Sequence, residues 1–356
     1  MTASSGSQPL SPLKALLLSD GRPGHYHLAE GIIAAVVHRH PVETVRLEIR
    51  RRRWMPGRVL AALMGAGAGP AALLRLGYGL SSRSLPAAGL VVSAGGDTLA
   101  ANIGAAKVLA VPNIFYGSVR RFSPEDFALV LTSHARHGER ARHVRTLKPS
   151  PADPDAMPPL APAARGGQKL AVAGLLVGGD TTTIRYTSGD WERLVAFLRA
   201  MSAAAGTRWI VSNSRRTPPM ASAALSRLAA EPESPVLRFI DVGSAGAGTL
   251  GELFARSEAI LCTVDSSSMV SEAVWLRRPV LAIAPAEAAL PANEQEYRDY
   301  LETNGWTRSL AIADLTPAIV LDELGRVTPL ASNPLDLLAA TLKEKLPQLF
   351  PDAPSA

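Results

Sequence analysis

The sequence contains a single cysteine, Cys262, which lies within a run of apolar residues. One thiol forms neither an intramolecular disulfide framework nor a thiolate metal cluster. No uncharged apolar run reaches the roughly 18 to 20 residues that a membrane-spanning helix requires. The His-Glu-x-x-His and Walker sequences are also missing, so zinc-hydrolase and P-loop functions have no support. These absences favour a protein of a reducing compartment that does not cross a membrane.

Residues 1–12 are polar and lack the basic-then-apolar order of a secretory signal, so we predict a disordered leader there. The formal net charge is +6 at pH 7, and its densest contribution is the block Arg50–Arg53, followed by Trp54. A long apolar, glycine-rich segment comes next, at residues 59–76. We expect a cytoplasmic protein, with peripheral association with the inner membrane left open.

A basic cluster beside an apolar segment is how a peripheral protein docks on anionic lipid. Arg50–Trp54 and residues 59–76 therefore predict an anionic membrane surface as a partner. The alternative is a buried helical hairpin with a solvated arginine edge. No aromatic interleaving or zinc-finger spacing accompanies the arginines, so we do not expect a nucleic-acid partner.

Short apolar runs alternate with helix-like patterns through the first part of the chain. The candidate strands are residues 13–19, 43–49, 89–94, 108–111 and 127–132, and the candidate helices are residues 26–38 and 99–106. Strands that alternate with helices predict a parallel, doubly wound sheet. Residues 13–148 are therefore expected to form an N-terminal Rossmann-like domain.

Prolines interrupt this alternation in residues 149–168, a composition typical of an interdomain linker. Further candidate strands are residues 170–177, 208–212, 236–241, 259–263 and 279–284, with a candidate helix at residues 191–204. Residues 169–330 thus predict a second Rossmann-like domain, and residues 331–350 a helix that packs back on the first. The expected fold class is α/β, with two Rossmann-like domains facing each other across a cleft.

The most informative stretch is residues 263–273, a hydroxyl-rich turn between two apolar runs. Its order predicts a strand, a polar turn and then a helix. A helix that opens on serines presents unpaired backbone N–H groups and the positive end of its dipole, which favour a diphosphate. Glu272, about two turns into the helix, is placed to accept hydrogen bonds from ribose hydroxyls. The alternative is that Asp265 or Ser266 merely caps the helix.

Two further turns follow strands of the same domain and should lie at the same sheet edge. Gly178 and Gly179 would let the chain approach the bound nucleotide without a Cβ clash. Arg215 and Arg216 would bind phosphate oxygens through their guanidinium forks. Alternatively, one of them pairs with a carboxylate across the cleft and the other is solvated. The predicted donor-binding residues are Gly178, Gly179, Asp180, Thr181, Ser214, Arg215, Arg216, Asp265, Ser266, Ser267, Ser268, Met269 and Glu272.

The motifs at residues 212–218 and 263–273 resemble those of the mitochondrial-fission ELM-type family, whose bacterial members are treated as candidate glycosyltransferases. The resemblance spans most of the chain from Leu16 to about Pro285. The turn Gly21–His25 is similar to the opening turn of the peptidoglycan N-acetylglucosaminyltransferase of the GT-B superfamily. The resemblance implies a nucleotide diphosphate sugar as donor substrate, held chiefly by the C-terminal domain, with no cofactor and no obligatory metal.

The resemblance thus implies that the protein is a metal-independent GT-B glycosyltransferase. The sequence does not identify its acceptor, and a membrane-associated acceptor is left open. Plant proteins of the family are thought to recruit a dynamin-like partner to mitochondria, so a non-catalytic recruitment protein is an alternative. An epimerase or hydrolase of nucleotide sugars on the same scaffold is another.

Transfer also requires that an acceptor hydroxyl lose its proton. His25, in the first strand-to-helix turn, is the candidate base, because imidazole exchanges protons near neutral pH. Asp20 would orient it or act as the base itself. The alternatives are that His25 is a polar residue at a helix start and that Asp97 caps a helix. The predicted acceptor side also includes Gly24, Gly95, Gly96 and Asp97.

Overall fold

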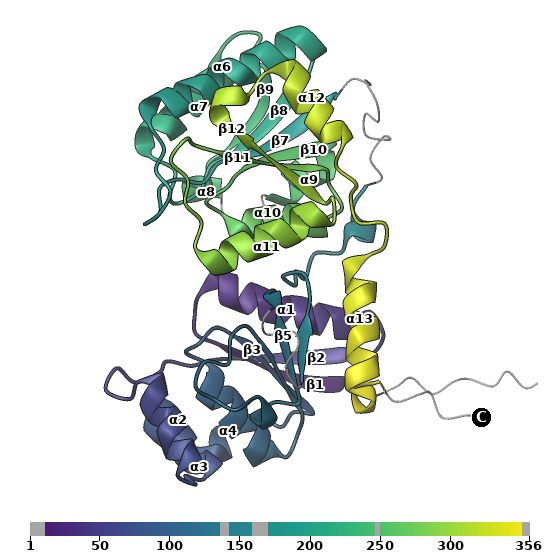
Figure 1. The fold of residues 1–356 in the computed structure, drawn as a ribbon. Coiled ribbons are helices and arrows are strands. Elements are labelled where there is room, and N and C mark those ends of the chain that lie inside the picture. Colours follow the sequence, from purple (N-terminus) through teal and green to yellow (C-terminus); the bar gives the residue numbers. More distant parts are fainter. Residues whose placement is uncertain (1–10, 136–141, 159–169, 246–249, 351–356) are drawn as a thin grey trace, which may run out of the picture. The chain divides into compact units, whose positions relative to one another are not determined.

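The computed structural model describes residues 11–135, 142–158, 170–245 and 250–350. The chain divides into two compact units (Figure 1). Unit 1 runs to Ala152 and also contains the C-terminal segment from Pro334, whereas unit 2 spans Asp153–Asn333. Residues 1–10 of the predicted leader and residues 159–168 of the proline-rich segment lie outside the described residues.

Unit 1 is built on a six-stranded parallel sheet with the order β2-β1-β3-β4-β5-β6. Its strands are β1 Leu13–Ser19, β2 Val42–Glu48, β3 Leu90–Ala94, β4 Asn113–Tyr116, β5 Leu129–Thr132 and β6 His143–Arg145. All five residues of β3 are buried, as expected for a central strand covered by helices on both faces.

Helices cover both faces of this sheet (Figure 1). They are α1 Pro23–Val37, α2 Gly57–Gly65, α3 Pro70–Tyr78 and α4 Leu99–Leu109. The last helix, α13 Pro334–Lys345, contacts α1 through a face on which Leu338, Ala339 and Leu342 are buried. The C-terminal segment therefore completes unit 1, although the rest of unit 1 precedes it in the chain by about 180 residues.

Unit 1 differs from the sequence prediction at two strands, because β6 was not predicted and residues 108–111 do not form a strand. The strand expected at residues 108–111 is wrong, because α4 continues to Leu109 and the chain then leaves it through Ala110 in a left-handed conformation, with φ of 55°. The next strand, β4, begins only at Asn113. The apolar segment 59–76 forms the hairpin of α2 and α3, whose buried residues Leu60, Leu73 and Leu74 join the core. The segment thus packs on the core as a helical hairpin, as one alternative held, but its start is not buried, because Trp54 and Val59 stay exposed.

Unit 2 repeats the architecture with a second six-stranded parallel sheet, in the order β12-β11-β10-β7-β8-β9. Its strands are β7 Val172–Leu176, β8 Arg208–Ser212, β9 Val236–Ile240, β10 Ala259–Thr263, β11 Val280–Ala284 and β12 Thr307–Ala311. Its helices are α6 Ser188–Ala205, α7 Pro219–Ala230, α8 Val242–Ala245, α9 Leu250–Arg256, α10 Ser267–Trp275, α11 Ala292–Thr303 and α12 Pro317–Gly325. The predicted α/β class with two Rossmann-like domains is confirmed.

Short 3-10 helices complete the described structure: η1 Ser82–Ser84, η2 Pro124–Asp126, η3 Pro154–Ala156, η4 Ile312–Asp314 and η5 Pro347–Leu349. The turn η3 opens unit 2 within the proline-rich segment. Asn333, the last residue of unit 2, donates hydrogen bonds from Nδ2 to Asp153 at 2.8 Å and to Asp155 at 2.9 Å. The first residues of unit 2 and its last residue, at the two places where the chain passes between the units, are therefore hydrogen-bonded to each other.

Candidate functional site

The strand order of unit 2 brings three polar turns to one edge of its sheet. Strand β7 lies between β10 and β8, and all three strands are parallel. Their carboxyl ends lead into residues 178–181, 213–218 and 264–268. In open parallel sheets, ligands bind outside the carboxyl ends of the strands. The turns that the sequence analysis singled out are thus neighbours in space.

A buried carboxylate, that of Asp265, holds these turns together. Its side chain has no exposed surface, and its Oδ2 accepts hydrogen bonds from Arg216 at 2.6 Å and from the backbone N–H of Gly179 at 3.1 Å. The Tyr186 hydroxyl donates to Oδ1 at 3.1 Å. Burial and the neighbouring carboxylate raise the pKa of Tyr186 well above its usual value, so this hydroxyl stays a donor. Both oxygens of the Asp265 carboxylate therefore accept hydrogen bonds from protein groups.

The two glycines of the first turn are required by contacts within the protein. A Cβ on Gly178 would lie 2.1 Å from the Asp265 carboxylate, and one on Gly179 would lie 2.0 Å from the carbonyl oxygen of Arg216. Both distances are well below van der Waals contact. Close packing against Asp265 and Arg216 therefore accounts for this Gly-Gly pair without any ligand.

The two arginines of the second turn have different surroundings. Arg216 pairs with Asp265 inside unit 2, so its charge is compensated by the protein. Arg215 is exposed and has no hydrogen-bond or ion-pair partner among the described residues. All donors of Arg215 are therefore open to a phosphate, whereas Arg216 uses part of its guanidinium to bind Asp265.

Helix α10 begins at the third turn. Ser266 is its N-cap, since its Oγ accepts a hydrogen bond from the N–H of Met269 at 3.4 Å, whereas the Asp265 carboxylate is turned to Gly179 and Arg216. Ser267 and Ser268 open the first turn, and Ser268 is exposed. The helix has nine residues. Its N-terminus thus combines an uncharged cap with the positive end of the helix dipole, a combination that suits an anion.

Other predicted donor-side residues organise the loops. Asp180 accepts the backbone N–H of Tyr186 at 3.0 Å and pairs with Arg185 at 3.3 Å. The Thr181 hydroxyl accepts the N–H groups of Thr183 and Ile184. The hydroxyls of Ser214 and Thr217 lie 3.2 Å apart.

Sequence reasoning missed two residues at this edge, Tyr186 and Thr217. The Thr217 hydroxyl donates to the carbonyl oxygens of Val177 and Gly178, at 2.9 and 2.7 Å, and so joins the second turn to the first. Tyr186 lies between two strands that the pattern identified, and no motif marks it. Only its contact with Asp265 shows its place in the site.

Glu272 lies in the second turn of α10, where burial raises its pKa to about 7. At neutral pH this carboxyl group therefore exists in both protonation states. A ligand that donates hydrogen bonds to the ionised form would shift the balance toward it.

In unit 1, His25 and Asp20 form a contact pair. The Nδ1 atom of His25 lies 2.8 Å from Oδ2 of Asp20, whose side chain is 6% exposed, compared with 31% for His25. The imidazole lies against Gly95, where a Cβ would come within 2.2 Å of Nδ1 and where φ is +89°. Gly95 is thus required both by its backbone conformation and by the ring. His25 does lie in the first turn of α1, as one alternative held, but it is also oriented by Asp20.

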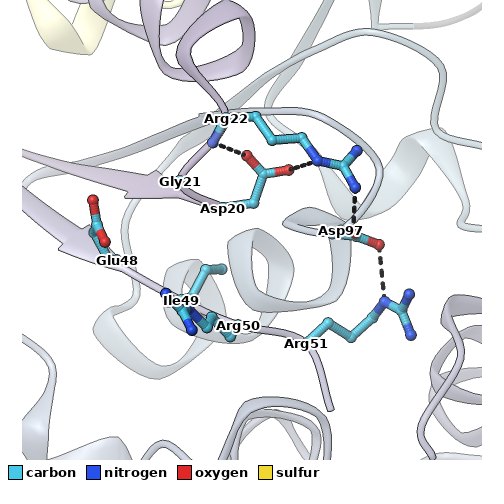
Figure 2. Close-up of a pocket in the computed structure, with 8 residues that line it drawn as sticks. All are labelled: Asp20, Gly21, Arg22, Glu48, Ile49, Arg50, Arg51 and Asp97. Atoms are coloured by element: carbon cyan, nitrogen blue, oxygen red, sulfur yellow. Dashed lines mark hydrogen bonds and ion pairs between the residues drawn. The ribbon is translucent and has the colours of Figure 1, made fainter. Parts of the chain in front are cut away.

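Next to this pair is a pocket of about 300 Å³ at the carboxyl ends of β1, β2 and β3 (Figure 2). It is lined by Asp20, Gly21, Arg22, Glu48, Ile49, Arg50, Arg51 and Asp97. The Asp97 side chain makes no capping bond to α4. It accepts a hydrogen bond from Arg51 Nε at 2.9 Å and lies 3.6 Å from Arg22.

The two other glycines predicted for the acceptor side differ in their surroundings. Gly24 has open space around its Cα, whereas a Cβ on Gly96 would meet the guanidinium of Arg120 at 2.3 Å. Arg120 therefore lies over the turn that follows β3. Within the described residues, no group of three or more His, Cys, Asp or Glu side chains is placed to hold a metal ion. The same residues include no helix with the length and apolarity to span a membrane.

Comparison with known proteins agrees with this fold. Solved structures with the same fold include S. aureus MnaA with UDP (TM-score 0.52, 10% identity, covering 96% of this chain and 99% of that chain). A Listeria monocytogenes protein assigned as a UDP-N-acetylglucosamine 2-epimerase also matches (TM-score 0.53, 10% identity, 98% and 100% coverage). Acinetobacter baumannii MurG matches less well (TM-score 0.48, 10% identity, 95% and 100% coverage). No curated protein sequence matches.

The two parallel six-stranded sheets with flanking helices define a protein of the GT-B fold, with two Rossmann-like domains. The model of the mitochondrial fission ELM1 family matches residues 23–337. The chain belongs to this family.

Proposed function

We propose that the protein is a glycosyltransferase that uses a nucleotide diphosphate sugar. The observation that carries this proposal is the pair of His25 and Asp20, in contact at 2.8 Å, at the carboxyl edge of the unit 1 sheet. Membership of the ELM1 family and the GT-B fold, which is shared with a structure that contains UDP, support the choice of donor.

The pair suits general base catalysis. Asp20 accepts a hydrogen bond from the Nδ1–H of His25. The other ring nitrogen, Nε2, is then unprotonated, and its lone pair can accept a proton. Nε2 takes the proton of an acceptor hydroxyl as that oxygen bonds to the anomeric carbon of the donor sugar. The bond from this carbon to the diphosphate breaks at the same time, and the nucleotide diphosphate leaves with its electron pair. Asp20 then stabilises the imidazolium.

The leaving diphosphate gains negative charge, so it needs fixed donors. Arg215 and the N-terminus of α10, at Ser267 and Ser268, supply them in the proposal, and Glu272 accepts the ribose hydroxyls. Arg216 acts indirectly, because its partner is Asp265. The mechanism requires no metal ion.

Binding and turnover are tested together with a panel of UDP-, GDP-, ADP- and dTDP-sugars, by calorimetry and by release of the nucleoside diphosphate in the presence of cell extract as acceptor source. His25→Gln should abolish transfer and leave donor affinity within about twofold, because a base contributes on the order of 10² to 10⁴ in rate. His38→Gln, at the C-cap of α1, is the matched control.

Other results would favour the alternative functions. Product formed without any acceptor would indicate hydrolysis or epimerisation. Donor binding without turnover would indicate a recruitment protein. Equal loss of binding and transfer in His25→Gln would contradict the role of His25 as a base.

We also propose that the protein acts in the cytoplasm and docks on anionic membranes through Arg52, Arg53, Trp54 and Val59, the docking patch. Trp54 is 63% exposed and Val59 37% exposed, and the Arg52 guanidinium lies 5.5 Å from the centroid of the Trp54 ring. An exposed aromatic ring beside cations is suited to the interface of a bilayer.

Sedimentation with vesicles of phosphatidylglycerol and phosphatidylcholine tests this docking. Trp54→Ala should reduce binding, whereas Met220→Ala, which removes a 54% exposed side chain from unit 2, should not. Equal binding by both variants and the wild type would exclude the docking patch.

A further inference from the structure

The carboxyl edge of the unit 1 sheet carries an excess of arginine. The arginines in the segments that follow β1, β2 and β4 are Arg22, Arg50, Arg51, Arg52, Arg53, Arg120 and Arg121. Strands β2, β1, β3 and β4 are parallel neighbours, so these segments leave the sheet at the same edge. The pocket there is lined by three of these arginines, Arg22, Arg50 and Arg51, and by three carboxylates, those of Asp20, Glu48 and Asp97.

Each of these three carboxylates already has a cationic or imidazole partner. Asp20 contacts His25, Asp97 accepts a hydrogen bond from Arg51 Nε at 2.9 Å, and Glu48 accepts one from Arg46 at 3.2 Å. Arg46 does not line the pocket. Of the three arginines in the lining, Arg50 is the one left without a carboxylate partner among the described residues.

Two guanidinium groups in the pocket keep open donors. Arg22 spans Asp20 and Asp97, with separations of 3.9 and 3.6 Å that are too long for hydrogen bonds (Figure 2). Its side chain is 65% exposed. Arg50 is exposed and has no partner among the described residues. Ion pairing thus orients Arg22 while its N–H groups, and those of Arg50, remain available.

We propose that this pocket binds a phosphate group, through Arg22 and Arg50. Planar guanidinium forks match phosphate oxygens, and a pocket of about 300 Å³ has room for a phosphate with part of the molecule that carries it. Because Asp20 both lines the pocket and contacts His25, a phosphate bound there lies beside the proposed base. This inference rests on the proposed function, and it implies that the acceptor is a phosphorylated molecule. That molecule is either a soluble sugar phosphate or a phospholipid headgroup.

The phosphate site is tested with pyrophosphate, by calorimetry on the full chain in the absence and presence of saturating UDP. Arg22→Gln and Arg50→Gln should each weaken pyrophosphate binding roughly tenfold, because each removes charge-assisted hydrogen bonds. Arg75→Gln, which removes an exposed arginine from α3, is the matched control and should change nothing. UDP affinity should be the same in all of these proteins.

Unchanged pyrophosphate affinity in both pocket variants would overturn the proposal, as would its displacement by UDP in the wild type. Failure of the protein to bind any nucleotide sugar would instead contradict the proposed function, and the effect of Arg22→Gln and Arg50→Gln would still establish the phosphate site. The source of the phosphate follows from two further probes. Binding of glucose 1-phosphate indicates a soluble acceptor. Binding of a monomeric short-chain phosphatidic acid but not of glucose 1-phosphate, lost in Arg50→Gln, indicates a lipid headgroup.

Discussion

Glu272 offers a measurable link between burial, stability and ligand binding. Burial raises its pKa from the ordinary value of 4.5 to about 7. The folded protein therefore retains a proton that the unfolded chain has lost between these values, so stability falls as the pH rises through this window. At 1.36 kcal/mol per pH unit, the full loss is about 3 kcal/mol, an upper limit because water and relaxation reduce it.

The substitution Glu272→Gln removes the titration and keeps the shape of the side chain. Relative to the wild type, the variant should gain stability between pH 4.5 and 8, by up to about 3 kcal/mol. Urea unfolding at pH 4.5, 6, 7 and 8, followed by tryptophan fluorescence, measures this difference. Glu192→Gln, which changes an exposed glutamate of α6, is the control and should show no such trend. A difference that stays constant with pH would refute the reasoning.

The same carboxyl group makes a prediction for the ligand. Ribose hydroxyls donate hydrogen bonds and so favour the ionised carboxylate. The affinity of the wild type for a UDP-sugar, whose diphosphate has no proton to lose in this range, should therefore increase between pH 6 and 8 with release of a proton from Glu272. Glu272→Gln should lose this dependence. Calorimetry in two buffers of different ionisation enthalpy detects the proton. An equal pH dependence in the variant would remove Glu272 from the nucleotide site.

Two glycine substitutions test the packing of the candidate site residues, one in each unit. Gly178→Ala places a Cβ 2.1 Å from the Asp265 carboxylate. Urea titrations should show that this lowers the free energy of unfolding by about 1 to 3 kcal/mol. The control Gly325→Ala, where the added Cβ lies in open space, should not lower it.

Gly95→Ala should displace the His25 ring and reduce transfer at least tenfold, while donor affinity stays unchanged. Normal transfer by this variant would show that the position of the ring is unimportant.

Most of the strands could be predicted because they are continuous apolar runs in the interior of a parallel sheet. The exceptions have physical causes. Strand β12, Thr307–Ala311, is an edge strand with only one fully buried residue, so its sequence lacks the apolar run that identifies a central strand. Residues 108–111 are apolar because they end a buried helix, and a short apolar run does not distinguish these two cases.

The candidate sites, like the strands, could be predicted only in part from the sequence. Polar turns after strands predicted that Gly178, Arg216 and Asp265 belong to one edge, but their pattern gave Asp265 the role of a cap or a ligand-binding residue. In the structure Asp265 is a buried partner of Arg216 and Tyr186, and Ser266 is the cap. Contacts between residues about 50 to 80 positions apart leave no local signal in the chain.

The sequence by itself determined the alternation of strands and helices, and with it the two parallel sheets and the polar turns at their carboxyl ends, because periodicity and apolar content act locally. Tertiary structure alone decided which turns became neighbours, since strand order places β7 between β10 and β8. It also decided which charges were neutralised. Arg216 meets a buried carboxylate, while Arg50 and Arg215 meet none among the described residues, because pairing depends on distances that only the folded chain fixes.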